Sequence, residues 1–415
     1  HVSAIQGEMA INEHGVQSGN VGARMLDEAL LVDISPLSDG AGPTPEVLLN
    51  VRSKLGRSGL QHLLGSGLAG YFQGEAPWVF SLRFAGPAAH LALNVDMQGM
   101  GTSLPPPLDK VVGAPLSLSL ESVAADLGPA QHGVDVRLGD RAGGRLLFQH
   151  RATGGWSFLR GRMDVGGAPL SAPDGTGLHL GVRVPVLDAD RWRPVLRAAA
   201  HQGGTGAPDF LTRFSGEVND LVMFGRHFGQ FNLDMVKSPQ GWVSPLRGAT
   251  VRGNLLLTTP ADCAGAGCAS APGRLHNTLV LTLDQLVIPA PAATGVATKE
   301  AAFDPASLPE VHIKSKSLTF DGHALGEFEF AALPGADRWK IDKLRLTQPL
   351  MQVEASGVWQ VAARGGQQTR LQVHLSTPDL GAMLGAHGLG EELAGGAAEF
   401  VSSWDWEGSP GELSL

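Results

Sequence analysis

The chain has 415 residues, which is long enough for two or three ordinary domains or for one extended repetitive structure. Its 56 glycines and 27 prolines interrupt long helices, while its apolar content of 43% is too high for a disordered chain. The net charge of −9 argues against a nucleic-acid partner, because phosphate binding needs clustered Lys and Arg. No run of about 18 apolar residues signals a transmembrane helix. Composition therefore favours an all-β protein with many short strands.

Strands are predicted wherever apolar and polar residues alternate, because successive side chains of a strand point to opposite faces. An antiparallel sheet can leave one face in water, whereas a parallel sheet covered by helices shows continuous apolar runs. We therefore expect a long antiparallel sheet with one wet face. The clearest alternating segments are 91–97, 116–120, 134–138, 178–184, 231–235, 279–283 and 371–375.

Helices are expected to be few and short. The best candidate is 189–200, where Asp188 can cap the first turn and Pro194 must fall early or bend the helix. Two more are predicted at 58–64 and 379–386.

The chain is expected to divide at a glycine-rich polar segment. It begins with His rather than Met and ends in an apparent strand, so we expect a piece of a longer protein whose second repeat continues past residue 415. The expected parts are a first β segment over 1–200, a linker over 201–216, a repeat unit over 217–312 and a second repeat unit over 313–415.

The repeat has a period of 97 residues, since segment 221–233 matches segment 318–330 at most positions. Each copy places two glycines four residues apart, a spacing that suits a hairpin requiring positive φ or a close backbone approach. These glycines are Gly225 and Gly229 in the first copy, and Gly322 and Gly326 in the second.

A tryptophan follows the second glycine at the same distance in both copies. Trp242 lies 13 residues after Gly229, and Trp339 lies 13 residues after Gly326. We interpret each tryptophan as covering the start of the next strand. Phe224 opposite Asp321 is the clearest mismatch between the copies. Stacked units of this kind build a sheet that grows by addition.

Two cysteines, Cys263 and Cys268, lie in a loop of small residues. Four intervening residues can close a disulfide loop in an oxidising compartment, which is our prediction; two free thiols are the alternative. A metal site would need further ligands, and His276 is the near candidate.

Motifs of catalysis and cofactor binding are missing from the sequence. The GxGxxG pattern at 65–70 follows a predicted helical stretch instead of a strand, so we do not expect a nucleotide site there. We expect no catalytic residue, no cofactor and no metal. An enzyme ranks third among the possible functions.

Several short motifs are individually weak, but their order and spacing along the chain are together fairly specific. They are SLPPPLDK (103–110), APLSLSL (114–120), LRGRMDVG (159–166), GLHLGVRVPVLDADRW (177–192), WKIDKLRLTQP (339–349), ASGVWQ (355–360), TPDLGAMLGAHG (377–388) and WDWEGSP (404–410). In these features, which span most of the chain, the sequence resembles the YhdP branch of the AsmA-like family.

The resemblance implies a long periplasmic protein, anchored in the inner membrane of a Gram-negative bacterium, whose curved β-sheet forms a hydrophobic groove that moves phospholipid towards the outer membrane. The implied partners are phospholipid acyl chains and the two membranes, and protein partners are not indicated. A one-faced sheet curled along its length would likewise leave an apolar trough for acyl chains. The residues expected to line this groove are Leu221, Met223, Phe231, Leu233, Leu318, Phe320, Phe328, Phe330, Val373 and Leu375.

Two alternatives stay open from the sequence. The apolar strand faces are also compatible with an ordinary packed β-sandwich core. In that case the chain would be a structural or adhesive repeat protein of the envelope that binds protein partners.

Overall fold

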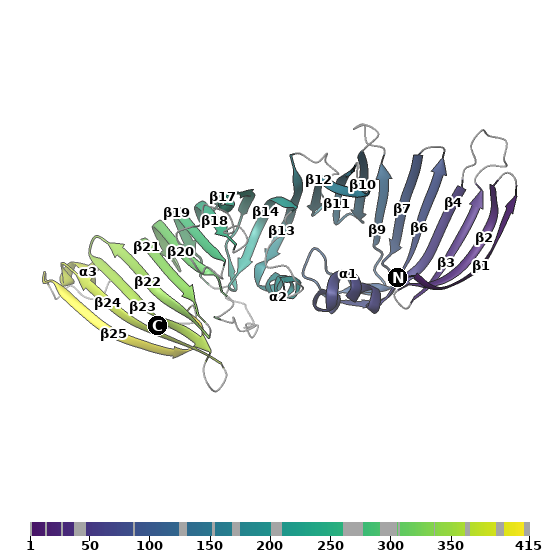
Figure 1. The fold of residues 1–415 in the computed structure, drawn as a ribbon. Helices are drawn as coiled ribbons and strands as arrows, with labels where there is room; N and C mark the ends of the chain where they lie inside the picture. The colour runs from purple at the N-terminus through teal and green to yellow at the C-terminus, as the bar shows by residue number, and fades with distance from the viewer. Residues whose placement is uncertain are drawn as a thin grey trace. The chain divides into compact units, whose positions relative to one another are not determined.

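The structure is a computed structural model that describes residues 2–12, 15–25, 28–36, 47–85, 88–123, 131–151, 154–167, 175–200, 210–259, 277–290, 305, 308–335, 337–361, 366–386 and 394–410. Among these residues the protein is all-β, with three short helices (Figure 1). The chain divides into two compact units, His1–Gly216 and Glu217–Leu415, called unit 1 and unit 2 below.

Unit 1 is a sheet with two helices and a small two-stranded ribbon at one end of its strands. Its strands are β1 (Val2–Asn12), β2 (Gly15–Met25), β3 (Glu28–Pro36), β4 (Val47–Leu55), β5 (Phe72–Gly74), β6 (Ala76–Ala85), β7 (Ala88–Asp96), β8 (Met100–Thr102), β9 (Ser117–Val123), β10 (Gln131–Leu138), β11 (Ala142–His150), β12 (Trp156–Val165), β13 (Gly177–Asp188) and the beginning of β14 (Leu211–Met223); its helices are α1 (Arg57–Ala69) and α2 (Ala189–Ala200).

Neighbouring strands of unit 1 follow one another along the chain, with β5 and β8 set apart as the ribbon. The pairs from β1 to β12 are antiparallel. The pair β12–β13 is parallel, an exception in a sheet that is antiparallel as expected from β1 to β12. A parallel neighbour needs a connection that returns to the starting end, and residues 166–176 separate the two strands in the sequence.

Both helices of unit 1 agree with local sequence signals. In α2, Asp188 Oδ1 accepts a hydrogen bond from Arg191 N at 3.0 Å, which satisfies a free amide of the first turn. Helix α1 is longer than the predicted 58–64, because the chain passes through Gly65 at φ 73 and then continues as helix. The two helices contact each other beside the ends of the strands (Figure 1).

Unit 2 is a second run of strands with one short helix. Its elements are the remainder of β14, β15 (Arg226–His227), β16 (Phe231–Ser238), β17 (Gly241–Gly248), β18 (Val251–Thr258), β19 (Thr278–Ile288), β20 (Glu310–Phe320), β21 (His323–Pro334), β22 (Arg338–Gln348), β23 (Met351–Val361), β24 (Gln367–Thr377), α3 (Leu380–Ala386) and β25 (Ala398–Glu407).

The strands from β16 to β25 pair with their successors in the chain. All of these pairs are antiparallel except β19–β20, which is parallel and is joined by residues 289–309. Helix α3 starts after Asp379, whose Oδ1 accepts a hydrogen bond from Ala382 N at 2.9 Å.

Two expected boundaries fall inside strands. Residues 211–216, which the sequence assigns to a linker, form the start of β14, while 201–209 lie outside the described residues. The expected junction of the repeat units at 312/313 lies within β20. Continuous strands thus cross both positions.

Candidate functional site

One face of unit 1 carries a row of apolar side chains from β2 to β13. Directly paired residues of neighbouring strands point to the same face, so the strand register defines the row. All its members except Gly144 are apolar and partly exposed. This unit 1 apolar row consists of Val21, Val32, Val51, Phe80, Leu93, Leu120, Val136, Gly144, Met163 and Leu180.

Unit 2 carries an equivalent row from β16 to β25. Leu246 and Leu283 of this row are buried, and Phe400 on the last strand is 49% exposed. The other apolar members are partly exposed. This unit 2 apolar row consists of Leu233, Leu246, Gly253, Leu283, Ser315, Phe328, Leu346, Val353, Leu375 and Phe400.

The opposite face of unit 1 is polar in the positions next to the apolar row. Asp135 forms a two-point ion pair with Arg145 at 2.6 and 2.9 Å, which raises the pKa of Arg145 through the hydrogen bond. Arg162 pairs with the buried Asp164 in the same way. The unit 1 polar row is Asn20, Asp33, Asn50, Ser81, Ala92, Glu121, Asp135, Arg145, Arg162 and His179.

The opposite face of unit 2 carries charges of alternating sign. Each strand from β20 to β24 contributes one residue to a row of directly paired side chains, which are, in order, Lys314, Glu329, Arg345, Glu354 and His374. The Arg345 guanidinium donates to Glu354 Oε1 at 2.5 Å, and this bond lowers the pKa of Glu354. A hydrogen bond from Lys343 lowers the pKa of Glu329, which also lies 3.5 Å from Lys314 Nζ. Opposite charges thus stabilise this face across the strands.

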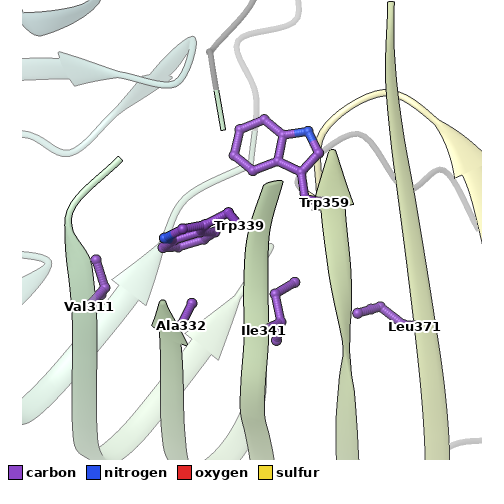
Figure 2. Packing of buried hydrophobic residues seen from close by; sticks show 6 residues of the cluster. All are labelled: Val311, Ala332, Trp339, Ile341, Trp359 and Leu371. Atoms are coloured by element: carbon purple, nitrogen blue, oxygen red, sulfur yellow. The ribbon is translucent and has the colours of Figure 1, made fainter. Parts of the chain in front are cut away.

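One end of the apolar face of unit 2 is filled by its own side chains. Figure 2 shows this cluster, in which Trp339 and Trp359 lie with ring centroids 6.2 Å apart. Phe330 packs on Trp339 at 5.5 Å, and Trp339 Nε1 donates to the Pro309 carbonyl at 3.0 Å. The buried cluster comprises Val311, Ala332, Trp339, Ile341, Trp359 and Leu371. The apolar row lies beside this cluster, nearer the other end of the strands.

The apolar face of unit 1 is filled at the end where α1 packs. Leu60 and Ala69 of α1 are buried against Ala76, Val95 and Met100. Further along the same strands the face opens, since Leu91 is 44% exposed and Phe84 is 43% exposed. In each unit, therefore, one end of the apolar face is packed, and the rest of that face, called the apolar lane below, is more exposed.

The structure places eight of the ten predicted groove-lining residues in several rows of the apolar face, and the other two, Leu221 and Met223, on β14. Leu233, Phe328 and Leu375 belong to the unit 2 apolar row. Phe330 and Val373 occupy the next row towards the tryptophans and pack against that cluster.

The remaining five predicted residues lie near the other end of the strands. Leu318 is buried and pairs with Leu286, while Phe320 pairs with Ile288. Leu221 and Met223 are partly exposed on β14, and Phe231 opens β16 opposite Gly248.

Sequence reasoning missed the whole row in unit 1 and most of the row in unit 2. The unit 1 row has a signal in the sequence, which is the alternation of apolar and polar residues within β6, β7 and β9. Phe80, Leu93 and Leu120 each belong to the apolar set of their own strand. The members of the unit 2 row that were not predicted are Leu246, Gly253, Leu283, Ser315, Leu346, Val353 and Phe400.

The repeat glycines lie at matching turns of two hairpins. Gly225 follows Phe224 and Gly322 follows Asp321, and all four residues have positive φ, between 47° and 86°. Both positions of each turn are therefore left-handed, as in two-residue hairpin turns.

The rest of the repeat agrees less closely. Gly229 precedes β16, whereas Gly326 lies within β21, although both have positive φ. Trp242 and Trp339 are both buried near the start of β17 and β22.

Other sequence expectations concern metals, membranes and thiols. Cys263 and Cys268 lie outside the described residues. Within the part of the chain that the structure describes, no three His, Cys, Asp or Glu side chains gather as metal ligands would. None of the helices described there is both long and apolar enough to cross a membrane.

Comparison with known proteins places this architecture in a family. A family model described as YhdP protein matches residues 1–415. No curated protein and no solved structure matches the chain. Because the family model covers the whole chain, the chain belongs to the YhdP family, a lipid-transport family of the cell envelope.

Proposed function

We propose that the chain carries phospholipid by holding acyl chains on the apolar face of its sheet. The observation that supports this proposal is the apolar row, which runs across neighbouring strands in each unit. Most of its side chains stay partly exposed, and the exceptions are Leu246, Leu283 and Ser315 of unit 2, which are buried. In keeping with the family, the site of action is the periplasm, in a parent protein anchored in the inner membrane of a Gram-negative bacterium. The role needs no catalysis.

Partial exposure favours a lipid site over a packed core. Side chains of a β-sandwich core are buried against a second sheet, whereas the apolar side chains at Leu91, Phe84 and Phe400 are at least 43% exposed. Burying an acyl chain contributes about 0.8 kcal/mol per CH₂, or on the order of 10 kcal/mol for a 16-carbon tail. The lane therefore offers acyl chains a favourable alternative to water.

The polar rows explain why lipid would use one face only. Charged pairs such as Arg345–Glu354 stay hydrated on the other face, and covering them with acyl chains would remove their solvation. The sheet thus separates an apolar lane from a hydrated outer side.

A photo-crosslinking amino acid placed at neighbouring positions of one strand tests the proposal. Leu346 and Arg345 lie on opposite faces of β22, and Leu93 and Ala92 on opposite faces of β7. Phospholipid adducts are expected at Leu346 and Leu93, but not at Arg345 and Ala92. Adducts at all four positions, or at none, would refute the proposal.

Charge substitution on β25 gives a matched functional test. Phe400 lies in the apolar row at 49% exposure, and Val401 lies on the other face at 77% exposure. Phe400→Asp places a carboxylate in the acyl path and is expected to reduce phospholipid transfer, while Val401→Asp should leave it unchanged. Because both side chains are exposed, neither variant should lower the melting temperature much. Equal transfer by both variants would argue for the structural or adhesive alternative.

The same test extends to more central positions. Phe328→Asp and Leu375→Asp are expected to block lipid passage more than they destabilise the fold. In a packed core these changes would instead cost about 3–5 kcal/mol and unfold the protein. Thermal melting beside a lipid-transfer assay separates the two outcomes.

A further inference from the structure

The turn between β14 and β15 contacts residues at the ends of β19 and β20, although these strands are not its neighbours in the sheet. Residues 221–228, called the hairpin tip below, pair within β14–β15, where Met223 is opposite Arg226. Arg226 nevertheless hydrogen-bonds to the Pro289 carbonyl after β19. Its Nη1 also lies 2.5 Å from Asp321 Oδ1, in the turn between β20 and β21. These partners directly follow β19 and β20, which are separated from β15 by several strands in the sheet order.

The distances require the hairpin tip to bend across its neighbours. From β16 to β20 the sheet order passes through β17, β18 and β19. At about 4.8 Å per step, this path is about 19 Å in a flat sheet. The hairpin tip crosses it over the turn between β17 and β18, where Thr250 Oγ1 donates to the Phe228 carbonyl at 2.8 Å. The hairpin tip therefore contacts the turn between β17 and β18, the end of β19 and the turn between β20 and β21 on the same edge of unit 2.

The bent hairpin tip lies against the end of the apolar face where Leu318 is buried. Arg226 Cζ lies 5.1 Å from the centroid of the Phe320 ring, and Phe320 is paired with Ile288 on that face. Phe228 and Leu318 are 5% and 4% exposed, in contrast to the partly exposed row residues, whereas Phe320 itself stays 37% exposed. A cation stacked on an aromatic ring and paired with a carboxylate is held more firmly than a freely exposed ion pair.

We propose that Arg226 is a positioning residue that clasps the hairpin tip to Asp321 and thereby closes the part of the apolar face around Leu318 to acyl chains. The clasp accounts for the mismatch in the repeat, since Asp321 supplies the carboxylate where the first copy has Phe224. The effect on acyl chains rests on the proposed lipid function. The clasp itself does not.

The distance between the two turns tests the clasp without lipid. Spin labels at Phe224→Cys and His323→Cys, in a background with Cys263→Ala and Cys268→Ala, report this distance by double electron–electron resonance. The unsubstituted clasp should give one narrow distribution. Arg226→Gln or Asp321→Asn should lengthen and broaden it, and the exchanged pair Arg226→Asp with Asp321→Arg should restore it. An unchanged distribution in both single variants would overturn the clasp.

A second readout links the clasp to lipid. A photo-crosslinker at Leu318 should gain phospholipid adducts in Arg226→Gln, whereas adducts at Leu346 should be the same with and without the clasp. Absence of adducts at Leu346 would overturn lipid carriage while the distance result still decides the clasp. Adducts at Leu346 with no gain at Leu318 would show that the clasp does not close the face.

Discussion

At the residue scale, glycines inside strands keep the apolar face regular where two backbones approach closely. Gly357 lies between Ile341 and Leu371, and a Cβ there would meet the Arg370 carbonyl oxygen at 2.0 Å. Gly357→Ala is therefore expected to lower the free energy of unfolding by about 1–3 kcal/mol, measured by urea denaturation. Gly385→Ala in α3 is the control, because a Cβ at that position would meet no described atom within 4 Å. Equal losses in both variants would contradict this explanation.

The two cysteines give another prediction at this scale. A loop of Ala and Gly between Cys263 and Cys268 can adopt disulfide geometry, so protein made in an oxidising compartment is expected to contain the bond. Thiol titration of denatured, unreduced protein should detect no free thiol. Two titratable thiols per chain would end the prediction.

At the element scale, the paired carboxylates Glu329, Glu354 and Asp405 on the charged face of β20 to β25 make the free energy of unfolding depend on pH. Hydrogen bonds from Lys343 and from Arg345 hold the pKa values of Glu329 and Glu354 below their usual range. Gln368 and then Arg370 lower the pKa of Asp405 in the same way.

A folded-state pKa below the unfolded value, about 4.3 for Glu, adds stability above that value, and this stability is lost as the pH falls through the folded-state pKa. Glu354→Gln should thus be less stable than the parent at pH 7, with a difference that fades below about pH 4. Denaturation at several pH values measures it. Arg345→Met should weaken the same pH dependence, and an unchanged difference down to about pH 3 would oppose this assignment.

At the scale of the whole molecule, the proposed lipid function can be tested in the apolar row of each unit. Leu93→Asp interrupts the row of unit 1, and Leu346→Asp interrupts the row of unit 2. If phospholipid passes both units, each variant alone should abolish transfer between membranes, and the double variant should be no worse, since one block already stops the flow. Ala92→Asp in the unit 1 polar row, and Thr282→Asp beside its partner Lys314 on the charged face of unit 2, are the controls. Loss of transfer in only one of the two row variants would show that lipid uses a single unit.

Local pattern was enough to predict the all-β class, several of the strands and the positions of the three short helices. Alternation predicts β7, where Leu91, Leu93 and Val95 share one side, because the side-chain period of a strand is two residues. The helix start after Asp188 follows from capping, and the turns at Gly225 and Gly322 follow from the need for positive φ. These features depend on neighbouring residues in the chain, so the sequence by itself determined them.

Tertiary structure decided how the strands combine. Register alone places Phe80, Leu93 and Leu120 in one row, and a slip of one residue would turn a strand's apolar side chains to the other face. The parallel pairs, the filling of one end by Trp339 and Trp359, and the reach of Arg226 to Asp321 all join segments separated along the chain. Such contacts depend on hydrogen bonding and packing between strands, and the alternation within one strand carries no information about its partner.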